Sequence, residues 1–241
     1  MNTQATRRQG FSLIESLLAM ALFLLILLAS LEFFAATRTA FFKLQSAQTN
    51  QESAMAALEK MKTDAFQSGQ GLLEPIGFGL VQGIDWTDGT LALMSLAKTS
   101  ALLTNAQVGQ TTINLDDGED FGPGKAACIF DINKGELLSV ASADEHGLTL
   151  TAPLAFNYIK GESAVILIQK VSYFLDAANS TLRRKVNAGA AQPLLEGVRS
   201  FVAGYGKDSH LLDIGIGLQS EPDKTRRLVA FLKNMALAER H

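Results

Sequence analysis

Glu15 is the residue whose position most needs a chemical reason, because it is a carboxylate near the start of a long apolar segment. A charge inside a membrane costs free energy, ~2.5–3.5 kcal/mol at a helix centre by insertion scales and less at the edge. A carboxylate in this position is therefore a candidate for function.

An apolar segment surrounds this carboxylate and follows a short basic leader. The leader, residues 1–10, is polar and contains two arginines, whereas Ser16–Leu31 contains no charge. Sixteen helical residues cover roughly 24 Å, which is shorter than the ~30 Å hydrocarbon core of a membrane. The wider segment 11–36 suffices for a full span, with Glu15 and Glu32 near its edges. Because the arginines precede the span, the sequence predicts a cytoplasmic amino terminus and an exported remainder.

Two other kinds of N-terminal segment fit part of this pattern. A secretory signal peptide has an apolar region of about 7–15 residues followed by a small-x-small cleavage site. Here the apolar run is longer, and Leu31–Phe34 is a poor site of that kind. A plain signal anchor fits the hydropathy, but it gives no reason for a carboxylate at Glu15.

The segment Gly10–Glu15, with the sequence GFSLIE, resembles the signature of type IV prepilins and of type II secretion pseudopilins. The resemblance implies that a dedicated inner-membrane aspartic peptidase cuts between Gly10 and Phe11, and that Phe11 is then N-methylated. It assigns Gly10 and Phe11 to processing, and Phe11 and Glu15 to assembly with neighbouring subunits. The implied cleavage would leave an α-amino cation at Phe11, one helical turn from Glu15. When subunits stack, Glu15 of one subunit could then pair with the Phe11 amine of its neighbour, so that the buried charge has a partner.

One continuous helix is predicted for residues 11–68, because no proline or glycine interrupts them. Its first part, 11–36, is apolar on all sides and is expected to be the transmembrane and assembly half, whereas 37–68 is amphipathic. One stripe recurs there at intervals of three and four residues: Leu44, Ala47, Gln51, Ala54, Leu58, Met61 and Ala65. A coiled coil is one interpretation, but three alanines and a glutamine make a weak seam, and packing on the protein's own β-sheet is the better account.

The helix is predicted to end at Gly69–Gly71, and residues 69–241 are predicted to form a β-rich head. Short β-type runs alternate with turn signals, at a spacing typical of an antiparallel sheet. These runs are Leu91–Leu96, Thr111–Leu115, Ala126–Phe130, Leu137–Ala141, Leu148–Thr151, Ala164–Gln169, Val171–Leu175, Leu195–Ala203, Leu212–Leu218 and Leu228–Leu232. The fold class is therefore α+β and pilin-like, with the long helix packed on the head. A small β subdomain is expected at about 110–170, inserted in the main sheet as a β-barrel.

The resemblance extends beyond the leader. Ala57–Gly69 resembles the helix end of PilW-like minor pilins and of the J-type minor pseudopilin, in both of which a glycine-rich turn follows. The closing sheet of PilW-like proteins is resembled by Val171–Leu175, Leu182–Arg184, Gln192–Val198 and Tyr205–Gly206. Arg226–Asn234 resembles its final strand.

The sequence contains no arrangement of residues typical of catalysis. The three histidines, His146, His210 and His241, have no carboxylate or cysteine at metal-ligand spacing, and His146 is expected in a hairpin turn. One acidic segment offers oxygen ligands that suit Ca²⁺, although it lacks the EF-hand order and a solvated loop is favoured. Its candidate ligands are Asp116, Asp117, Glu119 and Asp120. We therefore predict no enzymatic activity and no cofactor, with Ca²⁺ at this loop as the alternative.

Several other residues have a bland and a functional interpretation. Cys128 is the only cysteine, so no intramolecular disulfide can form, and it is expected to be a buried small hydrophobe. Trp86 suits a sugar or partner contact as well as core packing or loop anchoring. The net charge of −3 argues against a general nucleic-acid binder. Separated basic residues suit solvated faces better than a DNA-binding patch: Arg38, Arg183, Arg184, Lys185, Arg226 and Arg227.

The resemblance implies a structural protein: a minor pilin incorporated at or near the tip of a type IV pilus, where it primes assembly. The alternatives are a minor pseudopilin of a type II secretion system, a signal-anchored periplasmic binding or enzymatic domain, and a DNA-uptake minor pilin. Implied partners are the prepilin peptidase, other pilins or pseudopilins through the N-terminal helix, the inner-membrane assembly platform and, before assembly, the lipid bilayer. The implied location is the bacterial inner membrane, with one pass and a periplasmic head, and then the pilus or pseudopilus.

Overall fold

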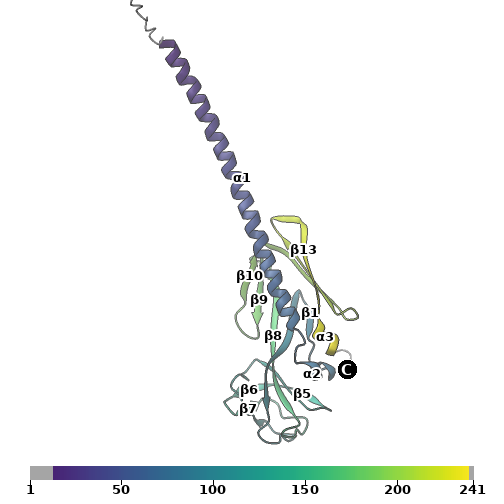
Figure 1. The fold of residues 1–241 in the computed structure, drawn as a ribbon. Coiled ribbons are helices and arrows are strands. Elements are labelled where there is room, and N and C mark those ends of the chain that lie inside the picture. Colours follow the sequence, from purple (N-terminus) through teal and green to yellow (C-terminus); the bar gives the residue numbers. More distant parts are fainter. Residues whose placement is uncertain (1–12, 239–241) are drawn as a thin grey trace, which may run out of the picture. The chain divides into compact units, whose positions relative to one another are not determined.

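The computed structural model describes residues 13–238, and they form a long helix and a β-rich head (Figure 1). The chain divides into two compact units, Met1–Glu52 and Ser53–His241, which are described separately below. Helix α1 covers Leu13–Gln67, so its last turns belong to the second unit. This α+β arrangement of a long N-terminal helix with antiparallel sheets confirms the predicted fold class.

Helix α1 ends where the sequence loses its helix formers. Gly69 and Gly71 adopt positive φ angles of 75° and 70°, which residues with a side chain rarely adopt. A Cβ on Gly69 would also lie 2.9 Å from the sulfur of Met235. The Gly69–Gly71 stop is therefore confirmed, and the short helix α2, Leu73–Gly77, follows it directly.

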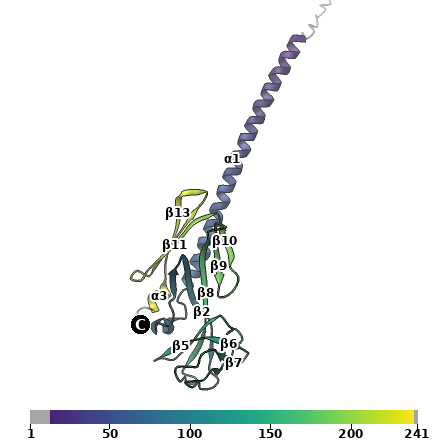
Figure 2. The same cartoon turned by 180° about the vertical axis from the view of Figure 1, so that it is seen from behind.

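Thirteen strands of the described chain form three antiparallel sheets (Figure 2). Their bounds are β1 Ile84–Thr87, β2 Thr90–Ala101, β3 Thr112–Asn114, β4 Ala126–Phe130, β5 Gly135–Leu138, β6 Val140–Ala143, β7 Gly147–Leu150, β8 Ala164–Asp176, β9 Thr181–Val186, β10 Gln192–Glu196, β11 Val198–Gly206, β12 Leu211–Leu218 and β13 Glu221–Phe231. The main sheet has the order β1-β2-β8-β4-β5, and β9 pairs with both β8 and β10. The two smaller sheets have the orders β11-β12-β13 and β3-β7-β6.

Strand β8 explains how the head is built, because it runs through both ends of the main sheet. Along one edge it pairs with β2 over almost its whole length. Along the other edge its first residues pair with β4 and its later residues pair with β9. The two predicted runs Ala164–Gln169 and Val171–Leu175 are therefore one strand.

Other predicted runs differ from the observed strands at turns. Leu195–Ala203 is divided by Gly197, whose φ of 68° breaks the extended backbone between β10 and β11. Leu137–Ala141 is likewise divided between β5 and β6. Strand β1 was not predicted, because it is short. Strand β9 was not among the predicted β-type runs, because its basic residues do not alternate with apolar ones, although Leu182–Arg184 within it resembles part of the closing sheet of PilW-like proteins.

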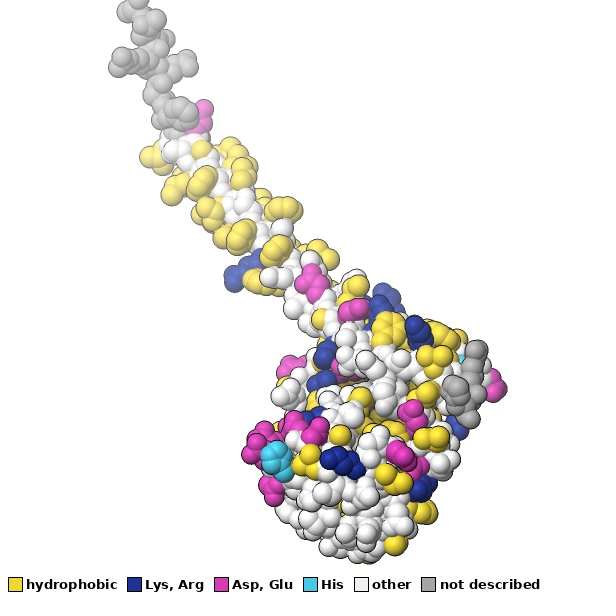
Figure 3. Space-filling model, turned by 60° about the horizontal axis from the view of Figure 1, so that its bottom comes forward, with side chains coloured by type: hydrophobic (Ala, Val, Ile, Leu, Met, Phe, Trp, Pro, Cys, Tyr) yellow, Lys and Arg dark blue, Asp and Glu magenta, His cyan; other side chains and the backbone are white. Residues whose placement is uncertain are grey.

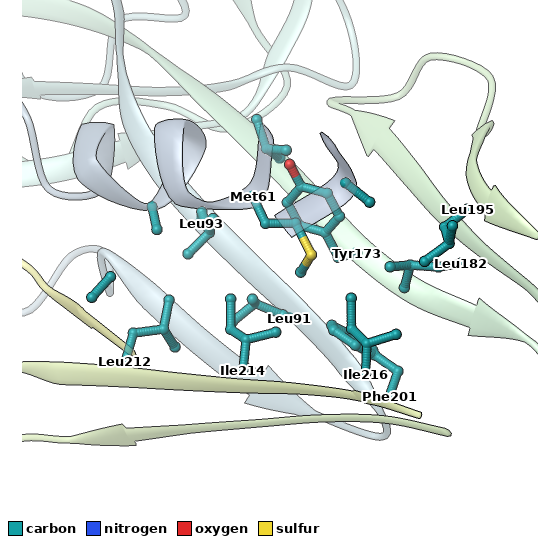
Figure 4. Packing of buried hydrophobic residues seen from close by; sticks show 14 of the residues in the cluster. Met61, Leu91, Leu93, Tyr173, Leu182, Leu195, Phe201, Leu212, Ile214 and Ile216 are labelled. Carbon is teal, nitrogen blue, oxygen red and sulfur yellow. The ribbon is translucent and has the colours of Figure 1, made fainter. Parts of the chain in front are cut away.

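The upper head is the part of the head that packs against the end of α1. Its core joins α1 to the main sheet and to the sheet β11-β12-β13. Figure 4 shows Met61 of α1 lying among side chains of β2, β8 and β12. The labelled side chains of the cluster are Met61, Leu91, Leu93, Tyr173, Leu182, Leu195, Phe201, Leu212, Ile214 and Ile216. Burial of each large apolar side chain contributes roughly 1.5–3 kcal/mol, so this cluster is what fixes the end of the helix to the head.

The amphipathic stripe of α1 is only partly confirmed. Ala54, Met61 and Ala65 are buried, and Leu58 packs against the same cluster. The predicted members nearer the amino terminus are exposed: Leu44, Ala47 and Gln51. The prediction was wrong for these three residues because a repeat along a helix shows which side can be apolar, but not how far the covering sheet extends.

The predicted small barrel is replaced by two packed sheets, and the described strands form no closed barrel. The three-stranded sheet β3-β7-β6 lies against one face of the main sheet at β4 and the first residues of β8, and the interface buries Ile113, Leu115 and Leu148. This part of the protein is called the lower head below. The other face of that sheet carries Cys128 and is covered by the segment around α2. Strands of three to five residues are too short and too few to close into a cylinder, so they share a core with β4 and β8 instead.

The C-terminal segment also corrects a prediction. The last strand was expected at Arg226–Asn234, but β13 ends at Phe231 and helix α3, Lys233–Ala238, follows. The Asn234 side chain donates a hydrogen bond to the carbonyl oxygen of Phe66 at 2.9 Å. The buried side chain of Met235 packs in the core, so α3 covers the end of α1 rather than extending the sheet.

Candidate functional site

The described N-terminal part of α1 is an extended exposed apolar surface. Every residue from Leu13 to Gln51 is exposed, and the hydrophobic side chains gather over the first part of this stretch, as Figure 3 shows. Among residues 13–238, α1 is the one helix long and apolar enough to cross a membrane. Exposed apolar patches of this extent mark a membrane or protein contact.

The hydroxyl side chains within this apolar part are satisfied by the helix itself. Ser30 donates to the carbonyl of Ile26 at 2.8 Å, and Thr37 donates to that of Phe33 at 2.8 Å. Such back-bonding lets a hydroxyl lie in lipid or against another helix without an outside partner. These two hydroxyls therefore need no hydrogen-bond partner from a neighbouring molecule.

Glu15 lies in the first turn of α1 as the structure describes it. A carboxylate there interacts favourably with the positive end of the helix dipole. The other two residues assigned to processing and assembly, Gly10 and Phe11, lie outside the described residues. Their roles, and that of Glu15 in assembly, stay predictions from the sequence.

A buried polar network attaches the other end of α1 to the head. Asp64 is only 5% exposed, and its Oδ2 accepts hydrogen bonds from Tyr173 Oη at 2.5 Å and Arg184 Nε at 2.8 Å. Lys60, one turn earlier, reaches Oδ1 of Asp64 at 3.1 Å. The carboxylate therefore has partners on both oxygens, as a buried charge requires.

The network changes the acidity of its members. Burial alone would raise the pKa of Asp64, but the bonds from Arg184, Tyr173 and Lys60 outweigh it and lower that pKa below 3.8. Burial, followed by the neighbouring carboxylate, raises the pKa of Tyr173. Asp64 is therefore ionised and Tyr173 protonated at neutral pH. One feature of the sequence indicates this network: Asp64 is a charged residue among the small and apolar residues on the packed side of the helix.

The acidic segment is a loop held by hydrogen bonds and one lysine. Asp116 accepts from Ser100 Oγ at 2.5 Å, the main cause of its lowered pKa, and from the Ala101 amide at 2.8 Å. Lys98 Nζ lies 2.5 Å from Asp117 and 3.2 Å from Asp120, and this pairing raises the pKa of the lysine. The fourth candidate ligand, Glu119, is exposed.

Within the part of the chain that the structure describes, no three His, Cys, Asp or Glu side chains form a group that could hold a metal ion. The ammonium of Lys98 balances the charges of Asp117 and Asp120, as a bound metal ion would. Calcium binding by the acidic loop stays a prediction.

Cys128, Trp86 and His146, which the sequence analysis singled out, have packing or turn positions in the structure. Cys128 is fully buried, which raises the pKa of its thiol to about 12. Trp86 is half-buried in β1 and packs edge-on against Phe201, with ring centroids 5.4 Å apart. His146 lies in the turn before β7, where its amide donates to Asp144 Oδ1 at 3.0 Å.

The basic residues considered for DNA lie on different elements, and four of them are already ion-paired. Arg183 pairs with Asp176 at 2.8 Å, and Arg184 pairs with Asp64. Arg226 and Arg227, on β13, lie 3.0 Å from Glu221 and 3.8 Å from Asp213. Their charges are therefore partly balanced within the head, whereas a nucleic-acid surface needs a cluster of uncompensated cations.

Comparison with known proteins finds one match, at the N-terminus. Residues 5–31 match the family model described as the prokaryotic N-terminal methylation motif, which is the signature of type IV prepilins and pseudopilins. The chain therefore carries this signature, and the apolar helix that follows it fits membrane anchoring. No curated protein and no solved structure matches the chain.

This motif has consequences for chemistry and partners. It is typical of structural proteins without enzymatic activity. It also implies processing by a prepilin peptidase and assembly with other pilins. The matched residues include Gly10, Phe11 and Glu15, the three residues that the sequence singled out.

Proposed function

We propose that this protein is a minor pilin, processed by prepilin peptidase and incorporated at or near the tip of a type IV pilus, where it primes assembly. The observation that carries the proposal is the methylation motif at residues 5–31 continuing directly into an exposed apolar helix. A helix that is apolar on every side needs a lipid or protein environment along its whole length.

The proposed mechanism is assembly rather than catalysis. The membrane holds the processed subunit with its amino terminus in the cytoplasm and its head in the periplasm. Extraction exchanges the lipid around residues 11–36 for the helices of neighbouring subunits. Glu15 then pairs with the amino terminus of a neighbour and sets the relative height of the two subunits, because an unpaired carboxylate in an apolar bundle is costly.

The head supports a minor rather than an abundant role. The head, residues 69–241, is large for the family's major subunits, and its end away from the attachment of α1 carries the sheet β3-β7-β6 (Figure 1). The single cysteine leaves the chain without the disulfide-bounded C-terminal loop common in major pilins. Such a head suits contacts made once, at the tip, rather than repeated along a filament.

The second candidate is a minor pseudopilin of a type II secretion system. It is favoured by Ala57–Gly69, the helix end that resembles the J-type minor pseudopilin as well as PilW-like proteins. The genes beside this one distinguish the two machines, since a pilus operon and a secretion operon encode different assembly components.

Mass spectrometry of the protein purified from its bacterium tests the proposal. We expect a chain that begins at Phe11 and carries one added methyl group, and we expect Gly10→Asp to leave the leader uncut. Gold labelling of the head should then mark one end of each pilus. An intact leader in the wild-type protein would support a signal-anchored domain instead. Salt-dependent binding of DNA to the head would favour an uptake pilin.

A further inference from the structure

Strand β13 has a free edge, because it pairs with β12 alone among the described strands. The amide of Leu232 donates to the carbonyl of the opposite residue, His210, at 2.9 Å. Bonded residues alternate along an antiparallel pair, so Ala230 and Leu228 also bond to β12. The residues that alternate with them point their amides and carbonyls away from β12: Thr225, Arg227, Val229 and Phe231. No other main-chain group of residues 13–238 bonds to these four.

The second half of this edge has no protection against a further strand. Proteins normally blunt an edge strand with charged side chains, proline or a bulge. The first half of β13 has such features in Pro222, Lys224 and Arg226. The second half, Leu228–Phe231, contains no charge, no proline and no register shift. Its outward amides and carbonyls are therefore open to an extended chain.

The side chains beside the open amides are apolar and exposed. Val229 and Phe231 are 59% and 52% exposed, whereas Ala230 between them is buried in the core. The same outer face of the sheet continues with Val202 of β11 and Leu211 of β12, which are also exposed. An added strand would cover these apolar side chains as well as bond the open amides.

The first half of the edge is basic. Lys224 is exposed and has no ion pair in the described chain. Arg227 is 72% exposed and lies 3.8 Å from Asp213, which is a weak contact. Arg226 is paired more closely, at 3.0 Å from Glu221. A strand that lies along β13 therefore meets two cations that lack a close counter-charge, and carboxylates on that strand would complement them.

Pairing of two β13 strands does not suit two copies of this chain. The last turns of α1 lie lengthwise along β12 (Figures 1 and 4), and β13 is antiparallel to β12. Antiparallel pairing of two β13 strands would therefore point the ends of the two α1 helices in opposite directions, whereas subunits of one membrane or filament point them the same way. Parallel pairing over the same residues would place the cations of Lys224–Arg227 beside those of the copy.

The other sheet edges of a copy are short or covered. Strands β1, β3, β5, β6 and β10 have three to five residues each, against 11 in β13. Strand β11 is longer, but its edge lies beside β1, where Trp86 packs against Phe201. A different protein is therefore the better source of the added strand.

We propose that the free edge of β13 binds an extended segment of a different protein as an added strand. This segment has apolar side chains beside Val229 and Phe231, and Asp or Glu beside Lys224 and Arg227. Main-chain hydrogen bonds supply affinity, and the side chains at alternate positions supply selectivity. The inference goes beyond the proposed function and rests on it only for the common orientation of the subunits.

In-cell photocrosslinking of the full-length protein tests the proposal. A benzophenone amino acid replaces Thr225, which is exposed at the edge. We expect an adduct with a different protein, in which the cross-linked peptide has alternating apolar residues next to Asp or Glu. Val229→Pro removes an outward amide without breaking a bond to β12, and it should lower the adduct yield about fivefold or more at equal membrane content. Val229→Thr is the matched control: it keeps the amide and the β-branched shape, and it should change the yield by less than about twofold.

A reversal of charge gives a second measurement that does not alter the main chain. Lys224→Glu should lower the adduct yield about threefold or more, because it sets a carboxylate against those of the added strand. Lys207→Glu is its matched control, since Lys207 is exposed in the turn before β12 and away from this edge, and the yield should stay unchanged.

The outcomes that would overturn the proposal are distinct. They are an adduct with a second copy, no adduct, a cross-linked peptide without carboxylates, or a yield that Val229→Pro or Lys224→Glu leaves unchanged. Mass spectrometry of the same samples separates the two ideas. A chain that begins at Phe11 and shows no dependence on β13 overturns only this inference, whereas an uncut leader with such a dependence overturns only the proposed function.

Discussion

The phenol of Tyr173 on β8 donates a hydrogen bond to the carboxylate of Asp64 on α1, with 2.5 Å between the two oxygens, although the two residues are 109 positions apart in the sequence. The bond joins the end of the assembly helix to the central strand of the head. Arg184 of the neighbouring strand β9 reaches the same carboxylate oxygen at 2.8 Å. The helix is thus fixed to the sheet by a charge as well as by apolar packing.

Asp64→Asn should destabilise the head by about 3 kcal/mol, because it leaves the partly buried Arg184 without its counter-charge. Urea unfolding of residues 40–241 measures this change. Tyr173→Phe should cost less, about 1–2 kcal/mol, since Arg184 and Lys60 still hold the carboxylate. Glu59→Gln is the control, because it removes only an exposed pair with Lys62, and it should change the free energy of unfolding by less than about 0.5 kcal/mol.

The same network makes the head sensitive to acid. The pKa of Asp64 is lowered in the folded state, so its contribution is present above the unfolded value of 3.8 and is lost as the pH falls through the lower folded value. We expect the free energy of unfolding to fall as the pH drops below about 4–5, and the fall to be smaller in Asp64→Asn. An identical pH profile in both proteins would show that Asp64 is not the group responsible.

Cys128 should be chemically silent in the folded protein. It is fully buried, and burial raises the pKa of its thiol to about 12, so almost no thiolate exists at pH 8. A thiol reagent such as DTNB should react at least roughly 100-fold faster in urea than in buffer. Fast reaction in buffer would mean that the α2 segment opens away from this face of the sheet.

Lys98 should determine whether the acidic loop responds to calcium. In the wild-type protein its ammonium lies at 2.5 Å from Asp117 and 3.2 Å from Asp120, so added Ca²⁺ should leave the Tm unchanged. Lys98→Gln removes that charge and leaves the carboxylates, and Ca²⁺ should then raise the Tm. Thermal unfolding with Ca²⁺ and with Mg²⁺ measures the difference, and a Ca²⁺ response in the wild type would contradict this account.

Gly118→Ala should destabilise the lower head by about 2 kcal/mol, because a Cβ at this buried position would lie 2.5 Å from the carbonyl oxygen of Asp144. Hydrogen exchange at the amides of β3, β6 and β7 should rise before that of β12. Gly204→Ala is the matched control: it lies on β11 with no atom within 4 Å of the added Cβ, and it should change stability by less than about 0.5 kcal/mol.

Local patterns predicted the elements of the head better than their boundaries. Ala126–Phe130 was predicted with the bounds that β4 has, because apolar β-formers there lie between glycine-containing turns. The pattern predicted Leu228–Leu232, and the resemblance extended the last strand over Arg226–Asn234, but β13 begins at Glu221 and the chain leaves the sheet after Phe231 and forms α3. The difference arises because α3 is fixed by packing of Met235 and the bond from Asn234 to Phe66, which are distant in sequence.

The candidate site likewise has one part that the sequence predicts and one part that only the tertiary structure shows. The sequence by itself determined the N-terminal part: Gly10, Phe11, Glu15 and the apolar run lie within one short segment, and their chemistry depends on order and spacing along the chain. Only the tertiary structure decided that Asp64 is buried beside Tyr173 and Arg184, that packing of α1 begins at Ala54, and that the lower head is two packed sheets rather than a barrel. These features depend on which segments distant in sequence pack together and on how far each contact extends. A periodic pattern along one segment reports neither the packing partner nor the length of the contact.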